Sequence, residues 1–195
     1  DQDQAIPSLA QLDPYQSFWL HFDYSKDVTK DWLKNFKSLD EVVVNALLSE
    51  ETRPRATFIK DGALISLRGV NLAPNSNPED MVSIRLWLTK DRVITTRRRK
   101  LLSVCDIALE FDQGVGPRSP AEFVVRLTQF LIGRMSNTIE EIEDKVSEIE
   151  ERILSNNSYE LRNEISDVRR QIIALRRYLS PQREAMTQLM SEKNA

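Results

Sequence analysis

The sequence contains few of the residues that build metal centres, disulfide frameworks or phosphate-binding loops. Its 195 residues include a single cysteine, Cys105, and a single histidine, His21. One cysteine excludes an internal disulfide and any multi-cysteine metal cluster, and one histidine excludes sites built from several histidines. The five glycines form no phosphate-binding loop, and neither a nucleophile elbow nor a paired-carboxylate motif is present. We therefore do not expect an enzyme.

Long apolar runs and a surplus of positive charge are also absent. No stretch approaches the ~18 apolar residues of a membrane helix, and the N-terminal residues do not resemble a signal peptide. The formal net charge of -3 argues against a general nucleic-acid binder, which needs a basic surplus. We expect a soluble cytoplasmic fragment with one domain, or one domain and an appendage.

The first half of the chain has the pattern of a mixed α/β domain. The alternating aromatic stretch SFWLHFDYS (17–25) predicts a strand, and residues 25–50 have the spacing of two short helices. Residues 56–70 predict a β-hairpin in which Asp61-Gly62 supplies the tight turn that needs a positive φ. Residues 71–80 are rich in turn formers and predict a loop.

Residues 81–98 predict a second β-hairpin that turns at Lys90-Asp91. Its two strands place apolar residues on one face because side chains alternate along a strand. The residues expected opposite one another are Ile84, Leu86 and Leu88 on the first strand, and Val93, Thr95 and Arg97 on the second.

A boundary is expected at DQGVGPRSPAE (112–122), where two glycines and two prolines interrupt the chain. Ser119, Pro120 and Glu122 have the order of an N-cap, a first helical residue and an N3 acid. The strongly apolar stretch 122–135 predicts a helix buried against the sheet. We expect an α/β domain at 1–118 and a helical part at 119–195.

Two apolar seams with steps of three and four residues follow, which is the pattern of helices packed lengthwise. The first helix is expected from Ser136 to Leu154, and a polar link of four residues then forces an antiparallel partner. Pro181 removes a backbone donor from the second helix. The seam residues are Ile139, Ile142, Val146, Ile149 and Ile153, followed by Leu161, Ile165, Val168, Ile172, Leu175 and Leu179. The expected fold is an α/β/α sandwich with mixed or antiparallel β-hairpins, followed by a long antiparallel helical hairpin.

The first helix of this hairpin carries seven carboxylates and two basic residues between Thr138 and Leu154. The second carries more arginines than acids, so the two are expected to pair along their flanks. Carboxylates three or four residues apart also bind hard cations. A solvated helix face is the simpler interpretation, and a weak, labile cation surface is the alternative. The candidate metal-binding acids are Glu140, Glu141, Asp144, Glu148 and Glu151.

His21 and Cys105 are the remaining candidate metal ligands, because imidazole and thiolate favour zinc. His21 lies on an expected strand between apolar neighbours, where a structural histidine is the commoner interpretation. A tight zinc site, or a metal-dependent enzyme, would need one of the two beside converging acids from elsewhere in the chain.

A basic run, TTRRRKL (95–101), ends the second hairpin. Nucleic-acid binding would need aromatic residues or further patches beside it. The candidates for an anion site or an intersubunit salt bridge are Arg97, Arg98, Arg99 and Lys100. The simplest interpretation is a solvated edge that also blocks sheet aggregation.

Four stretches together resemble the CorA-type divalent-metal transporters, in the zinc transporter ZntB branch. They are EETRPRATF, LRGVNLAPNSNPEDMVSIRLWLTKDRVITTRRRKL, GVGPRSPAEF and IIALRRYLSPQREAMTQL, and the similarity extends from about Trp19 to Met190. The most specific piece is LRRYLSPQRE (175–184). TRPR (52–55) together with VNL…PEDMVSIRLW favours the zinc branch over magnesium-transporting members.

The resemblance implies a bacterial inner-membrane homopentamer whose N-terminal α/β/α domain forms a cytoplasmic funnel. In that family a stalk helix and two membrane helices follow the helical hairpin, and this sequence stops at Ala195, before them. The chain is thus expected to be the cytoplasmic domain, attached to the membrane through the missing helices. Zn2+ is the expected transported ion, and no cofactor is expected for the isolated domain.

The function that follows is a regulatory and assembly domain of a zinc or divalent-cation transporter, without chemistry of its own. Its expected partners are further copies of itself and divalent cations, and nucleic acid is not among them. The alternative is a soluble coiled-coil interaction module that binds a partner protein.

Overall fold

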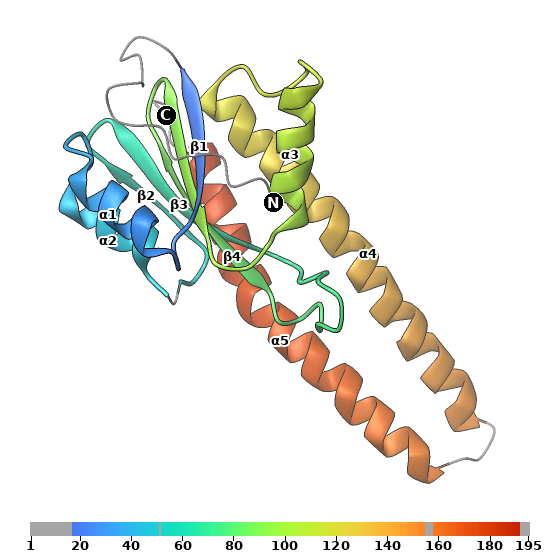
Figure 1. Cartoon of the computed structure of the whole chain (residues 1–195). Helices are drawn as coiled ribbons and strands as arrows, with labels where there is room; N and C mark the ends of the chain where they lie inside the picture. Colours follow the sequence, from blue (N-terminus) through green and yellow to red (C-terminus); the bar gives the residue numbers. More distant parts are fainter. Residues whose placement is uncertain (1–16, 51, 155–157, 192–195) are drawn as a thin grey trace.

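The computed structural model describes residues 17–50, 52–154 and 158–191 (Figure 1). Its centre is a mixed five-stranded sheet with the strand order β1-β5-β4-β3-β2. β1 runs parallel to β5, and the other neighbouring strands are antiparallel. The strands are β1 (Phe18–Asp23), β2 (Arg55–Ile59), β3 (Gly62–Gly69), β4 (Val82–Leu88) and β5 (Arg92–Arg97).

Helices cover both faces of the sheet, which confirms the expected α/β/α sandwich. Two short helices, α1 (Asp27–Asn35) and α2 (Glu41–Leu48), enclose one apolar core with residues such as Val43 and Leu47. On the other face lie α3 (Leu102–Asp112), α4 (Pro120–Leu154) and α5 (Ser158–Ser191). There Ile84, Leu86, Ile107 and Leu127 are fully buried in a second core.

The register of the β4–β5 hairpin is the one expected from the sequence. Ile84 pairs with Arg97, Leu86 with Thr95, and Leu88 with Val93. This register follows because the Lys90-Asp91 turn and the apolar alternation agree on which side chains enter the core.

The β2–β3 hairpin forms as expected, but its turn differs in detail. The positive φ, 51°, belongs to Lys60 and not to Gly62. Gly62 instead begins β3 directly beside Trp87, where an added Cβ would lie 2.4 Å from the indole ring. The glycine is therefore required by packing, and the expectation that the Asp61-Gly62 pair supplies the positive φ was wrong.

α4 begins with the expected cap. The Ser119 hydroxyl accepts the Glu122 backbone N–H at 3.2 Å, and the Glu122 carboxylate accepts the Arg118 N–H at 2.8 Å. The helix then continues without a break for 35 residues, so the buried helix and the first arm of the hairpin are one element. A division at residue 118 stays a prediction, and the core beneath the sheet takes residues from both sides of it.

α3 was not expected from the sequence. Its inner face carries Val104 and Ile107 into the core, and its outer face is exposed. Two ion pairs connect it to α4, namely Glu110 with Arg126 and Asp106 with Arg134. The helix fills the space between the end of β5 and the start of α4.

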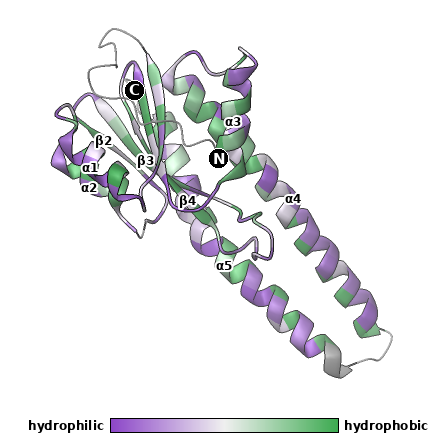
Figure 2. Cartoon of the chain, viewed as in Figure 1, coloured by the Kyte–Doolittle hydropathy of each residue, from purple (hydrophilic) through white to green (hydrophobic). Residues whose placement is uncertain are grey.

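Beyond the sheet, α4 and α5 form the expected antiparallel helical hairpin (Figure 1). In Figure 2, hydrophobic and hydrophilic residues alternate along both arms, as an amphipathic pair requires. The buried seam residues are Ile142, Ile149, Leu161, Val168 and Leu175. The link at 155–157 lies outside the described residues.

One ion pair crosses the hairpin with its charges reversed relative to the net charges of the two helices: its arginine belongs to the acidic α4 and its glutamate to the basic α5. Arg152 of the acidic arm donates to both Glu164 oxygens of the basic arm, at 2.6 and 3.0 Å. Flank pairing is thus present, while most acids of α4 and arginines of α5 face elsewhere. In the described part of the chain, no helix has the combination of length and apolar character that crossing a membrane requires.

Candidate functional site

Arg68 of β3 lies where the sandwich meets the helical hairpin and contacts three other segments of the chain. Its Nε and Nη2 donate to the Thr52 carbonyl at 3.2 and 3.0 Å, and its Nη1 donates to the Met81 carbonyl at 2.9 Å. Its guanidinium lies 4.0 Å from the centroid of the Tyr178 ring. The Arg68 backbone N–H donates to the Gln182 side chain at 2.7 Å.

Tyr178 and Gln182 are four residues apart on α5 and therefore share a helix face. Gln182 is buried although it is polar, and its amide oxygen accepts a β3 donor. Both belong to LRRYLSPQRE (175–184), the most specific of the stretches that carry the family resemblance. Their role in joining α5 to Arg68 was missed, because the sequence shows the motif but not the strand that it contacts.

The approach of α4 to the same strand depends on Gly69. An added Cβ there would lie 2.7 Å from the Leu131 side chain and 2.8 Å from that of Leu101. The absence of a side chain thus lets α4 pack directly on the end of β3. Arg68 and Gly69 together fix both hairpin helices to one point of the sheet.

Arg85 of β4 is the largest fully buried side chain among the described residues. Its Nη2 donates to the Glu50 carbonyl at 3.1 Å, and its guanidinium lies 4.5 Å from the centroid of the Tyr24 ring. Burial lowers the pKa of Arg85, and Tyr24 opposes this shift. Arg85 and Arg68 hold the segment that connects α2 to β2 through neighbouring carbonyls, those of Glu50 and Thr52.

His21 belongs to a closed hydrogen-bond network between β1 and β5. Thr95 Oγ1 donates to the Leu20 carbonyl at 3.2 Å and accepts from Trp19 Nε1 at 2.8 Å. His21 Nδ1 lies 2.8 Å from the same oxygen and must therefore donate to it. The other ring nitrogen, Nε2, accepts from Arg97 Nε at 3.2 Å. Both nitrogens are engaged, in the pattern of a neutral structural histidine.

The electrostatics of His21 agree with this geometry. Burial first, and then the Arg97 guanidinium, lower the pKa of His21, while Asp23 opposes the shift, and the resulting pKa is about 4. The imidazole is therefore neutral near pH 7, but its Nε2 lone pair, which could bind a metal, already accepts the hydrogen bond from Arg97. Cys105 lies apart from it on the exposed face of α3, where its thiol faces the Leu101 carbonyl at 3.7 Å.

The candidate acids of α4 are exposed, and at 100° per residue they lie within an arc of about 100° on one face of the helix. They are Glu140, Glu141, Asp144, Glu148 and Glu151. Glu148 has a distant ion pair with Arg152, at 4.0 Å. Across residues 17–50, 52–154 and 158–191, no three His, Cys, Asp or Glu side chains are grouped so that they could hold a metal ion. The geometry is that of a diffuse negative surface.

The basic run (95–101) begins in the last residues of β5, which is an inner strand of the sheet. β5 has β1 on one side and β4 on the other, so the interpretation of the run as a solvated sheet edge was wrong. Arg97 turns to His21 and, at 3.6 Å, to the Asp23 carboxylate. Arg98, Arg99 and Lys100 are exposed, and Arg99 donates to the Asp80 carbonyl at 3.2 Å.

Solved structures resemble this fold over almost its whole length. The full-length CmaX protein superposes with a TM-score of 0.85 at 35% identity, over 98% of this chain and 59% of that one. The cytoplasmic domain of ZntB from Vibrio parahaemolyticus has a TM-score of 0.82 at 25% identity, over 92% and 71%. The CorA magnesium transporter of Methanocaldococcus jannaschii, at 15% identity and a TM-score of 0.75, shares the fold.

Sequence comparison gives the same relatives. The zinc transport protein ZntB of Yersinia enterocolitica is 35% identical over 91% of this chain and 54% of the relative. The divalent cation transporter CmaX of Pseudomonas aeruginosa is 39% identical over 70% of this chain and 42% of the relative. The chain thus spans about half the length of the curated relatives that it matches. The family model of the CorA-like Mg2+ transporter protein matches residues 15–195. The chain therefore belongs to the CorA-like family, on the side of its ZntB and CmaX members.

Proposed function

We propose that the chain is the cytoplasmic regulatory and assembly domain of a bacterial inner-membrane transporter for zinc and related divalent cations. The observation that carries this proposal is the likeness to proteins described as zinc transport proteins, which extends over nine-tenths of the chain. The likeness to a structure described as a ZntB cytoplasmic domain supports the cellular side. Zn2+ is cargo in this proposal, and the domain has no cofactor.

The domain contributes electrostatics and mechanics, and no catalytic chemistry. The exposed carboxylates of the distal half of α4 raise the local concentration of divalent cations through their field. The contacts of Arg68 connect α5 to the sheet. In the full-length protein, which we take to be a homopentamer attached by membrane helices, a change in ion occupancy then reaches the sandwich through this junction.

A chimera tests the proposal. Residues 15–195 replace the matching segment of the Yersinia enterocolitica zinc transport protein, and zinc flux is measured in membrane vesicles that contain the chimera. We expect zinc flux above that of empty vesicles, because the chain is 35% identical to the Yersinia enterocolitica protein and has the fold of a structure described as a ZntB cytoplasmic domain. The matched control carries Leu86→Asp, which places a charge in the fully buried core and removes the folded domain.

Two outcomes decide the proposal. Zinc flux in the chimera, lost in the Leu86→Asp control, supports it. A chimera that inserts normally and transports no more zinc than empty vesicles would contradict it and would favour a coiled-coil interaction module. Calorimetric titration of Zn2+ and Mg2+ into the isolated chain then measures whether the α4 acids bind ions at all.

A further inference from the structure

Each of the two hairpin helices contains one residue that weakens an α-helix. Within the described helices α4 (120–154) and α5 (158–191), Gly133 is the only glycine, and Pro181 is the only proline beyond a first turn. Glycine loses more backbone entropy in a helix than any other residue. Proline has no N–H to donate to the carbonyl four residues earlier, which in α5 is that of Arg177. Each helix is therefore least stiff at one point.

These two weak points lie at the same level of the hairpin. The Thr128 hydroxyl of α4 lies 3.8 Å from Met186 Sδ of α5, which fixes the antiparallel register of the two helices. Gly133 comes five residues after Thr128, and Pro181 comes five residues before Met186. Both helices advance about 1.5 Å per residue, in opposite directions, so the glycine and the proline lie opposite each other.

Packing does not require the glycine at position 133. Gly133 is exposed, and an added Cβ would have no atom within 4 Å. Gly69 differs, because the same addition there would collide with Leu131. Alanine would therefore fit at position 133 and would stabilise the helix. The effect of Gly133 is to leave α4 less stiff at this level.

On the sheet side of this level, both helices are anchored to the end of β3. Leu131 of α4 packs against the bare backbone of Gly69. Gln182 of α5 accepts the Arg68 backbone N–H at 2.7 Å. Each anchor lies within two residues of the weak point of its helix. Any bending therefore begins immediately beyond the sheet.

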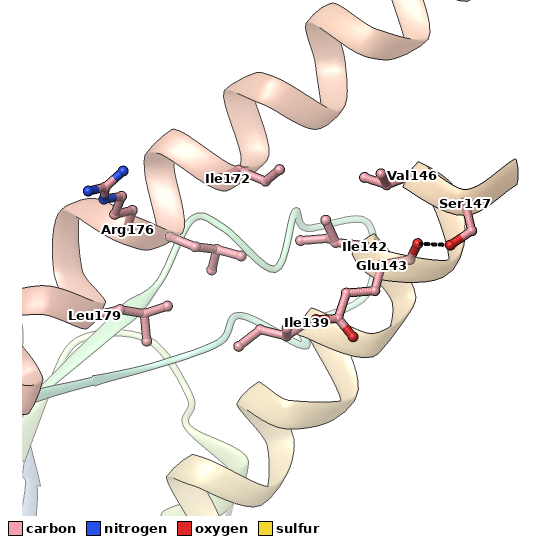
Figure 3. Close-up of a pocket in the computed structure, with 9 residues that line it drawn as sticks. Ile139, Ile142, Glu143, Val146, Ser147, Ile172, Arg176 and Leu179 are labelled. Atoms are coloured by element: carbon pink, nitrogen blue, oxygen red, sulfur yellow. Dashed lines mark hydrogen bonds between the residues drawn. The ribbon is translucent and has the colours of Figure 1, made fainter. Parts of the chain in front are cut away.

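On the other side of this level, the two arms of the hairpin hold each other. Figure 3 shows Ile142 of α4 pointing toward Ile172 and Leu179 of α5, across a hollow of about 470 Å³. Near the tip, Arg152 donates to both oxygens of Glu164 on the other arm. Because the arms are joined near the base and near the tip, they move as one body.

Two polar contacts cross the weak level and hold the hairpin to the sandwich. Arg134, the residue directly beyond the glycine in α4, forms an ion pair with Asp106 of α3. Tyr178, three residues from the proline on the hairpin side, lies under the Arg68 guanidinium at 4.0 Å. The side chains of Arg134 and Asp106 are 25% and 29% exposed, and Arg68 and Tyr178 are half-buried. Water therefore reaches both contacts, and they can open while the sandwich stays folded.

An apolar contact at this level permits small rotations. Met135 belongs to the same buried cluster as Val70 and Met81, which flank the loop between β3 and β4. Apolar contact is non-directional, so these side chains can slide over one another without losing a specific bond. The direction of the hairpin is thus set mainly by the two polar contacts.

We propose that Gly133 and Pro181 form a hinge at which the helical hairpin swings as one body against the sandwich. Arg134 and Tyr178 are its latches, through their contacts with the sandwich. While the latches are closed, the hairpin keeps its direction. When they open, the hairpin turns about the level of the two weak points, and the anchors on β3 stay in place.

This inference goes beyond the proposed function, because it concerns the motion of this chain alone. The hinge operates whether or not the chain belongs to a zinc transporter. Zinc flux in the chimera can therefore be absent while the hinge is present, and the reverse also holds. The two proposals are tested by separate measurements.

Distances between two spin labels in the 195-residue chain measure the swing. Cys105, exposed on α3, takes the first label, and Glu151→Cys near the tip of α4 takes the second. Cys105 is the only native cysteine, so the chain is labelled at these two positions alone. Pulsed electron resonance then gives the distribution of distances between the sandwich and the tip of the hairpin.

Two sets of variants separate the hinge from its latches. Arg134→Met with Tyr178→Leu opens both latches, and we expect the distance distribution to become at least twice as wide. Gly133→Ala with Pro181→Ala stiffens both helices. Added to the latch variant, this hinge pair should return the width to that of the unaltered chain, because stiff helices do not bend at that level.

The matched control is Ser147→Ala with Asn163→Ala. Both residues are exposed, one on each arm, and alanine stabilises the helix there as well. Added to the latch variant, this control should leave the distribution as wide as before. Far-UV circular dichroism checks that each variant keeps its helices. If the hinge pair does not fold, Gly133→Ala alone should remove at least half of the broadening, because its methyl group meets no atom within 4 Å.

Three results would overturn the proposal. The latch variant gives a distribution no wider than that of the unaltered chain. The hinge substitutions leave the broadened distribution unchanged. The control pair narrows the distribution as much as the hinge pair does.

Discussion

The sandwich and the helical hairpin use similar apolar residues but enclose them to different degrees. In the sandwich, Ile84, Leu86 and Leu127 are completely buried because a sheet with helices on both faces surrounds each side chain. In the hairpin, Ile165 and Ile172 stay almost half exposed, because two helices cover only one stripe of each other. The sandwich is therefore self-sufficient, whereas the hairpin depends on its attachment at the base and on whatever covers its outer face.

The largest expected effect is in the sandwich core. Leu86→Ala removes a fully buried side chain between the sheet and its covering helices. We expect the free energy of unfolding to fall by about 2–5 kcal/mol, from lost burial and the remaining cavity. Urea denaturation followed by circular dichroism measures the change. A loss under about 1 kcal/mol would mean that the sandwich is no better enclosed than the hairpin.

Acid should weaken the sandwich through His21. The folded pKa, about 4, lies below the ordinary 6.5, so the unfolded chain binds the proton first. The contribution of neutral His21 to the free energy of unfolding is therefore fully present above pH 6.5. It is lost as the pH drops toward 4, by up to about 3 kcal/mol.

Urea denaturation of the unaltered chain and of His21→Gln, between pH 7 and 4.5, measures this effect. His21 is the only histidine in the chain, so the loss of stability at the upper end of this pH range comes from its protonation. We expect the two curves to converge at low pH, because the variant has no imidazole to protonate. Parallel curves would show that the network around Thr95 does not keep His21 neutral.

Arg68→Met tests the attachment between the two regions. The variant keeps the aliphatic stem but loses the hydrogen bonds to the Thr52 and Met81 carbonyls and the charge over Tyr178. We expect about 2 kcal/mol of destabilisation. Amide exchange in α5 should also become faster, since the helix loses its anchor on the sheet.

The matched control for this variant is Arg177→Met. Arg177 is exposed and lies 5.5 Å from the same Tyr178 ring. It should cost less than about 0.5 kcal/mol. Equal effects of the two variants would mean that the Arg68 contacts are not a joint between the regions.

The smallest effect is expected in the hairpin seam. Ile172→Ala should cost less than about 1 kcal/mol, because the side chain is half exposed and alanine favours helix. Thermal unfolding in dilute solution measures it. A loss of more than about 2 kcal/mol in the free energy of unfolding, in dilute solution, would show that Ile172 is as well enclosed as a residue of the sandwich core.

The elements that the sequence predicted are those in which local signals agree with the fold. The β4–β5 register follows from alternation and the Lys90-Asp91 turn, and the start of α4 follows from Ser119 and Glu122. α3 escaped prediction because residues 102–112 follow a strand and a basic run without a cap. The role of Gly62 was misassigned, because only the folded sheet brings Trp87 beside it.

The candidate site was less predictable because it depends on long-range contacts. Gln182 lies 114 residues from Arg68, and nothing within either segment indicates the other. Thr95 and His21 are 74 residues apart, and the parallel β1–β5 pairing alone brings them together. The hairpin itself was predictable from its heptad seams, but the seams do not show which of its faces the sheet leaves exposed.

The unbroken path of α4 from the sheet to the hairpin tip makes it a lever. At 1.5 Å per residue, the stretch from Met135 to Leu154 extends about 28 Å beyond the sheet. With its base fixed near Gly69, a rotation of about 5° there displaces the tip by roughly 2.5 Å over that length. A side-chain rearrangement of a few tenths of an ångström at the base thus becomes a movement at the tip large enough to make or break an ion pair.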